Sequence, residues 1–273
     1  MFAGSANGAA VAKRTIEGQA TRQARTNHQI AIDSVHDEVV APNPFAQAIL
    51  FFRGGANGEE APLRVIQGPK TMLAYVDNVS VDPIHNEVVA AQTLTDAVLV
   101  FDREKGGDVA PIRVIHGPRT RMEQPWKTSL DPINNLIVVT TKTSILFFDR
   151  TAEGDTPPKW AIEGPGLREL SPRILTPVVY PEGKKVFVSL RVRKTGDNAI
   201  AVWNYGDNGD VPPWGVIKST PTTRLNVITN GGLTINPAAR EVMALAGDEY
   251  GSERILIFRA PELFRGPVAP VTK

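Results

Sequence analysis

The chain has 273 residues, and its 30 Lys and Arg stand against 29 Asp and Glu, which gives a formal net charge of +1. This balance gives no electrostatic footprint for nucleic acid or for an anionic membrane surface. The chain has no cysteine, so disulfides, thiolate catalysis and cysteine-ligated zinc are excluded.

A long repeat organises the sequence. Residues 52–71, FRGGANGEEAPLRVIQGPKT, return as residues 101–120, FDREKGGDVAPIRVIHGPRT. The start of the chain carries the same pattern in residues 2–8 and 13–18, so Met1 begins inside a repeat unit. Repeats of this length are typical of radial or stacked architectures.

In chain order, the first predicted strand is Val11–Ile16, which matches the end of the repeat unit rather than its beginning. Five units follow, of which the first four each read as four short runs and the last reads as three. The first runs alternate apolar and small residues, which predicts strands. They are Ile30–Asp33, Val79–Asp82, Thr128–Asp131, Pro177–Tyr180 and Leu233–Asn236.

A turn follows each first run, and three further runs complete each of the first four units. Asp82-Pro83 and Asp131-Pro132 are typical turn openings, because Asp bonds backbone amides onward and Pro presets φ. The second runs are rich in β-branched residues and begin near residues 38, 87, 136, 185 and 241. The third runs carry aromatics and end at Phe52, Phe101, Phe148, Trp203 and Phe258. The fourth runs are Leu63–Ile66, Ile112–Ile115, Lys159–Ile162 and Trp214–Ile217. Antiparallel sheets are predicted, and no convincing amphipathic helix.

Four strands in a repeat near fifty residues predict an all-β, single β-propeller domain over residues 1–273. The last unit has a third strand but only a frayed start of a fourth, whereas residues 1–26 offer a closing outer strand ahead of any first strand. We therefore expect five four-stranded blades, closed by the N-terminal strand, which completes the last blade and removes open sheet edges. The units span about 27–71, 72–120, 121–166, 167–225 and 226–273. A fragment of a larger ring is the alternative.

The repeat resembles the NHL-type propeller repeats of bacterial proteins, many of them exported. Residues 101–120 and 82–89 match that pattern best, and the likeness weakens between 165 and 230. The resemblance implies a propeller and an extracytoplasmic setting, and it brings no catalytic motif. The chain shows no secretory signal and no stretch near the roughly 20 apolar residues of a membrane span, so a cytoplasmic location stays open beside a processed, exported form.

A ligand of a propeller is expected at one mouth of the central channel, where first strands start and second-to-third strand loops lie. The residues four and five positions before the last residue of each first run vary between units, whereas the residues within the strands do not. The candidate binding residues in this ring are His28, Gln29, Asp77, Asn78, Trp126 and Lys127. Converging His, Asp and Lys side chains would support acid–base chemistry. The alternative interpretation is that each is a solvated strand end.

The loops at the same mouth supply the second candidate set. Lengthened loops on a rigid scaffold are where function tends to lie. The fourth unit has a basic loop at 191–197 and the fifth an acidic loop at 247–253, and the two could instead pair with each other. The loop candidates are Phe45, Arg191, Arg193, Lys194, Asp248, Glu249 and Tyr250.

Other recurring residues are interpreted as structural. His36 and His85 occupy one turn position that becomes Asn134 in the next unit, so we expect turn residues rather than metal ligands. Arg64 and Arg113 recur in the fourth strand, which favours a role between blades.

These observations favour a binding or scaffold module for a protein or glycan partner, without nucleic acid, cofactor, metal or catalytic residues. Its oligomeric state stays open, and so does a place in a larger assembly. The alternative function is a propeller hydrolase or lactonase, metal-assisted or not. Because fold alone does not define function, both hypotheses depend on the candidate residues named above.

Overall fold

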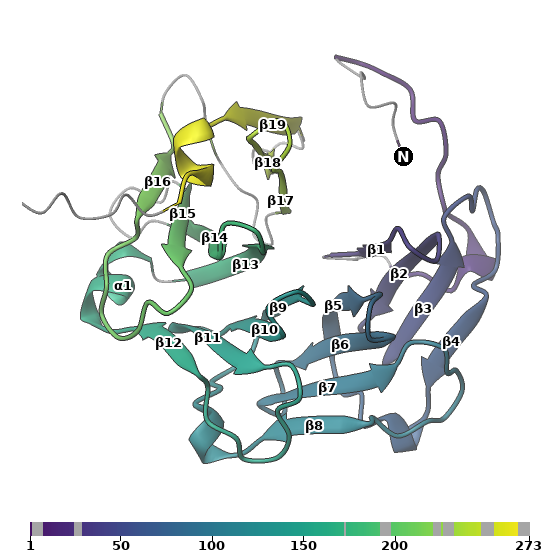
Figure 1. Ribbon diagram of the computed structural model, residues 1–273. Helices are drawn as coiled ribbons and strands as arrows, with labels where there is room; N and C mark the ends of the chain where they lie inside the picture. The colour runs from purple at the N-terminus through teal and green to yellow at the C-terminus, as the bar shows by residue number, and fades with distance from the viewer. Residues whose placement is uncertain are drawn as a thin grey trace, which may run out of the picture. The chain divides into compact units, whose positions relative to one another are not determined.

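The computed structural model describes residues 1, 8–24, 29–171, 173–191, 198–220, 225, 232–246 and 254–266. The chain is all-β, and its five antiparallel sheets are the blades of a β-propeller. Consecutive strands lie side by side within each sheet, as Figure 1 shows. The chain divides into two compact units, Met1–Val114 and Ile115–Lys273, which are described in turn.

The first unit holds the first blade and most of the second. The strands of the first blade are β1 (Ala31–Asp33), β2 (Glu38–Asn43), β3 (Ala48–Arg53) and β4 (Arg64–Gln67). The strands of the second blade are β5 (Val76–Asp82), β6 (Glu87–Gln92), β7 (Ala97–Asp102) and β8 (Arg113–His116), the last of which runs into the second unit. Every residue of β2 and β6 is buried. The interiors of these strands, residues 39–42 and 88–91, are continuous apolar runs because both faces of the strands are covered.

The second unit holds the other three blades. The third blade comprises β9 (Lys127–Asp131), β10 (Leu136–Thr140), β11 (Ser144–Asp149) and β12 (Trp160–Glu163). The fourth comprises β13 (Arg173–Tyr180), β14 (Lys185–Arg191), β15 (Asn198–Asn204) and β16 (Gly215–Lys218), and the fifth comprises β17 (Leu233–Asn236), β18 (Glu241–Ala246) and β19 (Arg254–Arg259). Trp203, the largest fully buried side chain, donates from Nε1 to the Val211 carbonyl at 3.2 Å.

Among the described residues the fifth sheet has three strands, and its missing fourth strand is the one that the sequence assigns to the N-terminus. The register of that segment agrees with the assignment. Ile16 forms a parallel bridge with Gly58, as the fourth-strand residues Ile66, Ile115 and Ile162 do with Gly107, Gly154 and Gly209. Residues 15–17 therefore make the edge contact of a fourth strand, but the predicted strand Val11–Ile16 does not form as a strand, and its pairing in the fifth blade stays a prediction.

Helices are few: most follow a fourth-strand segment, and one follows β19, the third strand of the fifth blade. Short 3₁₀ turns span η1 (Gln19–Thr21), η2 (Pro69–Thr71) and η3 (Pro118–Thr120), and η4 spans Pro261–Phe264. The corresponding segment of the third blade is a six-residue helix, α1 (Pro165–Leu170), which the sequence did not predict. Its proline lies at a position where the missing N–H costs nothing, and the buried Leu167 fixes its inner face.

The turns between first and second strands repeat one hydrogen-bond pattern. The Asp33 carboxylate accepts from the Val35 and His36 backbone amides and lies 2.8 Å from His36 Nδ1. Asp82 and His85 repeat this pattern, with a ring contact of 2.7 Å. Asn134 Nδ2 donates to Asp131 at 2.7 Å in its place. Because asparagine reproduces the ring contact, the prediction that both histidines are turn residues is confirmed.

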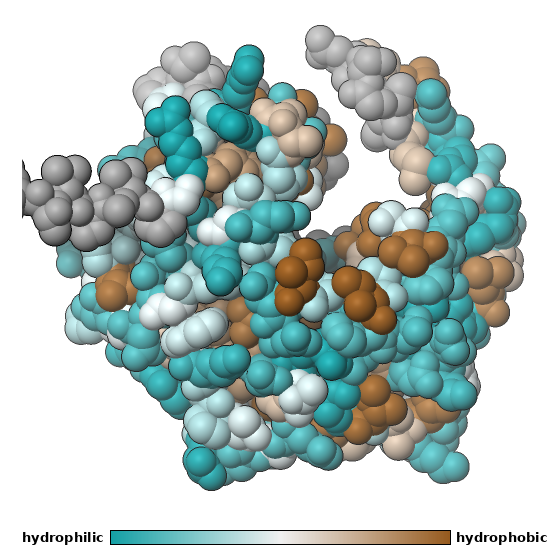
Figure 2. Space-filling view, viewed as in Figure 1, coloured by the Kyte–Doolittle hydropathy of each residue, from teal (hydrophilic) through white to brown (hydrophobic). Residues whose placement is uncertain are grey.

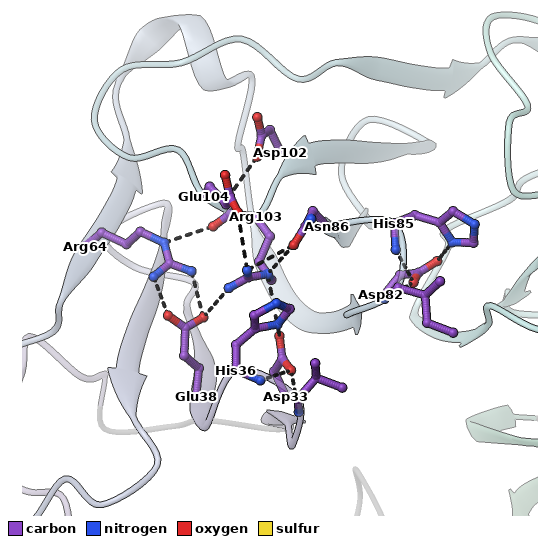
Figure 3. A network of polar contacts seen from close by, with 12 residues as sticks. Asp33, His36, Glu38, Arg64, Asp82, His85, Asn86, Asp102, Arg103 and Glu104 are labelled. Carbon is purple, nitrogen blue, oxygen red and sulfur yellow. Dashed lines mark hydrogen bonds and ion pairs between the residues drawn. The ribbon is translucent and has the colours of Figure 1, made fainter.

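A charged network joins the first two blades within the first unit. The Arg64 guanidinium donates two bonds to the Glu38 carboxylate, at 2.5 and 2.7 Å, and Arg103 adds a third at 2.8 Å. Arg64 Nε also donates to the Arg103 carbonyl, so one side chain contacts both blades. Figure 3 shows Glu38 lying between the two arginines, with Asp33 and His36 beside them. The predicted role of Arg64 between blades is confirmed.

This network makes the first unit sensitive to acid. Burial by itself would raise the pKa of Asp33, but hydrogen bonds from His36 and Val35 outweigh burial and hold that pKa below its usual value. The pKa of Glu38 is also lowered. Burial by itself would raise it, but the hydrogen bonds and charges of Arg64 and Arg103 outweigh burial. A carboxyl whose pKa is lowered in the folded state stabilises the protein at pH values above its unfolded-state pKa, which is about 4 for Asp and Glu. That stabilisation is lost as the pH falls through the folded-state pKa.

We therefore expect the melting temperature to hold from pH 7 to about pH 5 and to fall steeply below about pH 4, where these carboxylates become protonated. The measurement is calorimetry across that range on the wild type and on Asp33→Asn/Glu38→Gln. The variant should be less stable at pH 7 and should lose less on acidification. An equal acid loss in both proteins would contradict this assignment.

Candidate functional site

The first-strand starts and the second-to-third strand loops lie at the same end of each blade, as predicted for the mouth. In the hairpin registers, Val76 faces Gln92, Lys127 faces Thr140, and Arg173 faces Arg191. We call this end of the blades the mouth end. The opposite end carries the first-to-second strand turns.

Asp77 and Asn78 lie near the start of β5, where a β-bulge interrupts the pairing between Val76 and Val79. Both are buried, with exposed fractions of 1% and 0%, so the interpretation as solvated strand ends is wrong for them. Burial, with the Asp77 charge adding to it, raises the pKa of the neighbouring Tyr75. Bulges of this kind re-aim side chains at sheet ends.

The same bulge recurs in β13, between Ile174 and Pro177. There the buried Leu175 and Thr176 occupy the positions of Asp77 and Asn78. The Thr176 amide donates to Ser189 Oγ at 3.1 Å, and the Leu175 carbonyl accepts from Thr140 Oγ1 of the third blade at 2.7 Å. Through the second of these hydrogen bonds, the bulge of β13 links the fourth blade to the third blade.

Trp126 and Lys127 open β9. Lys127 is fully buried. The Trp126 amide donates to the Thr140 carbonyl at 2.7 Å, and the Arg173 guanidinium carbon lies 4.5 Å from the centre of the Trp126 ring. Arg173 was not among the candidates from the sequence, although it opens a first strand, β13, as Lys127 opens β9.

The loops of the first two blades present apolar tips. Phe45 is 71% exposed, and Leu94, in the equivalent loop of the second blade, is 72% exposed. The loop of Phe45 is fixed, because Asn43 Oδ1 accepts from the Ala46 amide and Asn43 Nδ2 donates to the Arg22 carbonyl. In the second loop the Thr95 amide donates to the Gln92 carbonyl. Figure 2 shows other hydrophobic side chains standing singly or in small groups on the face in view.

The structure describes two more of the predicted site residues and leaves six outside its described part. Gln29 precedes β1, and Arg191, which ends β14, is exposed. The remaining predicted residues lie outside the described part of the chain: His28, Arg193, Lys194, Asp248, Glu249 and Tyr250. The proposed pairing of the basic and acidic loops stays a prediction for the same reason.

A buried lysine marks a further departure from the repeat. Lys185 stands where the first two blades have Glu38 and Glu87. Its Nζ donates to Asn204 Oδ1 at 2.7 Å and lies 3.7 Å from the centre of the Trp214 ring. Burial lowers the pKa of Lys185, and the charge of Asp207 opposes that shift. Because the side chain is fully enclosed, we assign it to packing.

Within the described ranges, no group of three or more His, Asp or Glu side chains could hold a metal ion. No helix there is long and apolar enough to cross a membrane. At the mouth end, the first unit combines the buried Asp77 and Asn78 with the exposed Phe45 and Leu94. In the second unit, the buried Lys127 and the exposed Arg191 lie at the same end of their blades.

The fold defines a β-propeller protein, and comparison with known structures agrees. The chain is similar to a chain of Kuenenia stuttgartiensis hydrazine synthase, with a TM-score of 0.61 and 10% sequence identity. The match covers 89% of this chain and 66% of that chain, so this chain spans just under two thirds of the matched one. At this identity the likeness shows the fold alone. No family model and no curated protein sequence matches the chain.

Proposed function

We propose that this protein is a binding propeller, which presents the mouth end of its blades to a protein or glycan partner. The observation that carries the proposal is the repeated apolar loop tip. Phe45 and Leu94 occupy equivalent positions in neighbouring blades of one unit, and each extends from a hydrogen-bonded loop into solvent. Single exposed apolar residues are common on protein surfaces, but large apolar side chains on rigid loop tips suit a partner surface.

The NHL-type resemblance belongs to the same proposal. Repeats of that type serve as binding platforms as often as enzymes, so the resemblance is compatible with binding without choosing it. The exported setting that they suggest would place a partner outside the cytoplasm. The hydrolase or lactonase alternative relied on His28, Gln29, Asp77 and Asn78. Two of these are buried at a bulge and one lies outside the described residues, so we keep the binding role as the better supported hypothesis.

The test is partner capture from the native source by immobilised protein. We expect Phe45→Ser/Leu94→Ser to reduce the captured partner at least tenfold without changing the melting temperature, because both side chains are exposed. The matched control is Val35→Ser/Ile84→Ser, which removes two aliphatic side chains of 67% and 63% exposure from the turns at the opposite end of the same blades. Capture that survives the loop variant and fails in the control would contradict the proposal.

A further inference from the structure

Two arginines lie opposite each other at the mouth end of the fourth blade. Arg173 begins β13, Arg191 ends β14, and the two are paired residues in the sheet register. Like charges at directly opposed positions destabilise a sheet. The strand ends are nevertheless held in place, because Ser171 Oγ lies 2.6 Å from the Arg173 carbonyl oxygen and 2.8 Å from that of Arg191.

The third member of this group is Trp126, from the neighbouring third blade. Its ring lies under the Arg173 guanidinium at 4.5 Å, and its Nε1 is buried with no hydrogen-bond acceptor among the described residues. A guanidinium that stacks on an aromatic ring keeps its N–H edge free to bind an anion with two parallel hydrogen bonds. Trp126 therefore orients Arg173 without neutralising it.

Within the described ranges, no carboxylate forms an ion pair or hydrogen bond with the guanidinium of Arg173 or Arg191. Several other arginines do have a carboxylate partner. Arg64 and Arg103 bind Glu38, Arg113 binds Glu87, and even the exposed Arg53 binds Glu60. Two guanidinium groups in paired positions, with no carboxylate partner among the residues that the structure describes, are what a bound anion would stabilise.

We propose that Arg173, Arg191 and Trp126 form a binding site for a carboxylate of an acidic segment in a protein partner. This inference rests on the proposed binding function and names the chemistry of the partner. Carboxylate geometry matches the guanidinium fork. A protein is favoured over a glycan because sugars stack on open aromatic faces, and Arg173 covers one face of Trp126. The net charge of +1 makes this attraction local to the site.

The test uses the whole chain and a labelled hexaglutamate peptide at low salt, with hexaglutamine as the neutral peptide. We expect hexaglutamate to bind and to raise the melting temperature, and Arg173→Gln/Arg191→Gln to weaken binding at least tenfold. The matched control, Arg119→Gln/Lys218→Gln, removes two exposed cations of the same unit and should bind within twofold of the wild type. Trp126→Leu keeps the charge and should weaken binding several-fold.

The stability of the unliganded variant gives an independent readout. Because removing the two charges relieves repulsion, Arg173→Gln/Arg191→Gln should melt at the wild-type temperature or above it. A marked drop would show a structural role for the pair and would overturn the proposal. Equal binding by the wild type and this variant, or equal loss in the control, would also overturn it.

Oligogalacturonate and inorganic phosphate distinguish the sources of the anion. Tighter binding of oligogalacturonate than of hexaglutamate through the same arginines would overturn the assignment to a protein partner, and so would equal displacement of the peptide by phosphate at the same concentration. Failure of this site does not imply failure of the binding function, since Phe45 and Leu94 lie in other blades and are tested separately by capture.

Discussion

Replacing Glu38 by alanine is expected to lower the free energy of unfolding by about 3–5 kcal/mol, because it removes the closest counter-charge of two nearly buried arginines. Of its carboxylate contacts, Arg103 would keep only the longer ones, at 3.5 Å to Asp33 and 3.8 Å to Glu104. The side chains of Glu38, Arg64 and Arg103 are 9%, 19% and 5% exposed. Removing one partner of an enclosed ion pair leaves the desolvation of the other uncompensated. Denaturant unfolding followed by tryptophan fluorescence and by calorimetry measures the change.

The chain offers a matched control for this prediction. Arg53 and Glu60 form the same two-bond contact, at 2.5 and 2.7 Å, but in a solvent-exposed position. Glu60→Ala should therefore change stability far less than Glu38→Ala, since water and salt screen the exposed pair. Similar losses in the two variants would show that burial of the Glu38 network is not what makes it stabilising.

The second large effect is expected from Gly68→Ala, at the contact between a fourth strand and the loop of the next blade. Gly68 has φ of 137°, and a Cβ there would lie 2.5 Å from Asp108 Oδ1. That same oxygen accepts from the Lys70 amide at 2.7 Å and so caps the turn η2. Backbone strain and a displaced cap together should lower the free energy of unfolding by about 2–4 kcal/mol.

Gly107→Ala is the control, because Gly107 has φ of 80° and a Cβ at this position would have no neighbouring atom within 4 Å. It introduces strain without a clash and should cost about 1–2 kcal/mol. In an Asp108→Ala background the clash at Gly68 disappears, so the effect of Gly68→Ala should shrink towards that of Gly107→Ala. We call the close contact of Gly68 with Asp108 of the next blade the clasp. Equal losses of stability for the two glycine variants in the wild-type background would show that this contact does not stabilise the fold.

The clasp shows how the repeat serves the fold. Gly117 and Gly164 make the same close approach, to Asp155 and Asp210, and the amides of Arg119 and Gly166 donate to those carboxylates. The "Gly-Pro" end of one unit and the "Gly-Asp" loop of the next therefore form one interface. Their recurrence in the sequence reflects a contact between units and not a ligand site.

Much of the fold could be predicted from sequence because its determinants are local. The alternation of apolar residues identified Leu233–Asn236 with its observed bounds, and the fourth strands were displaced by one residue. Turn chemistry identified the hairpins, since Asp33, Asp82 and Asp131 each bond amides two and three residues onward. The recurrence of Ile16 in fourth-strand register followed from the repeat alone.

The candidate site could be predicted only in part. Gln29, Asp77, Asn78, Trp126 and Lys127 were placed correctly at first-strand starts, because counting back from a turn gives position along a strand. That count does not give burial, and Asp77, Asn78 and Lys127 are enclosed. Burial depends on what neighbouring strands and blades cover, which a single repeat unit does not encode.

The sequence by itself determined that this chain is a propeller of repeated antiparallel units, because period, turn residues and spacing act over short distances. Only the tertiary structure decided the pairing of Arg173 with Arg191. A one-residue bulge in β13 shifts the register there, and without it the hairpin would set position 173 opposite position 192. A shift of one residue turns side chains to the other face of a sheet. At this bulge the Leu175 carbonyl accepts from Thr140 of the neighbouring blade, a contact between repeat units that is not local in the sequence of the fourth unit.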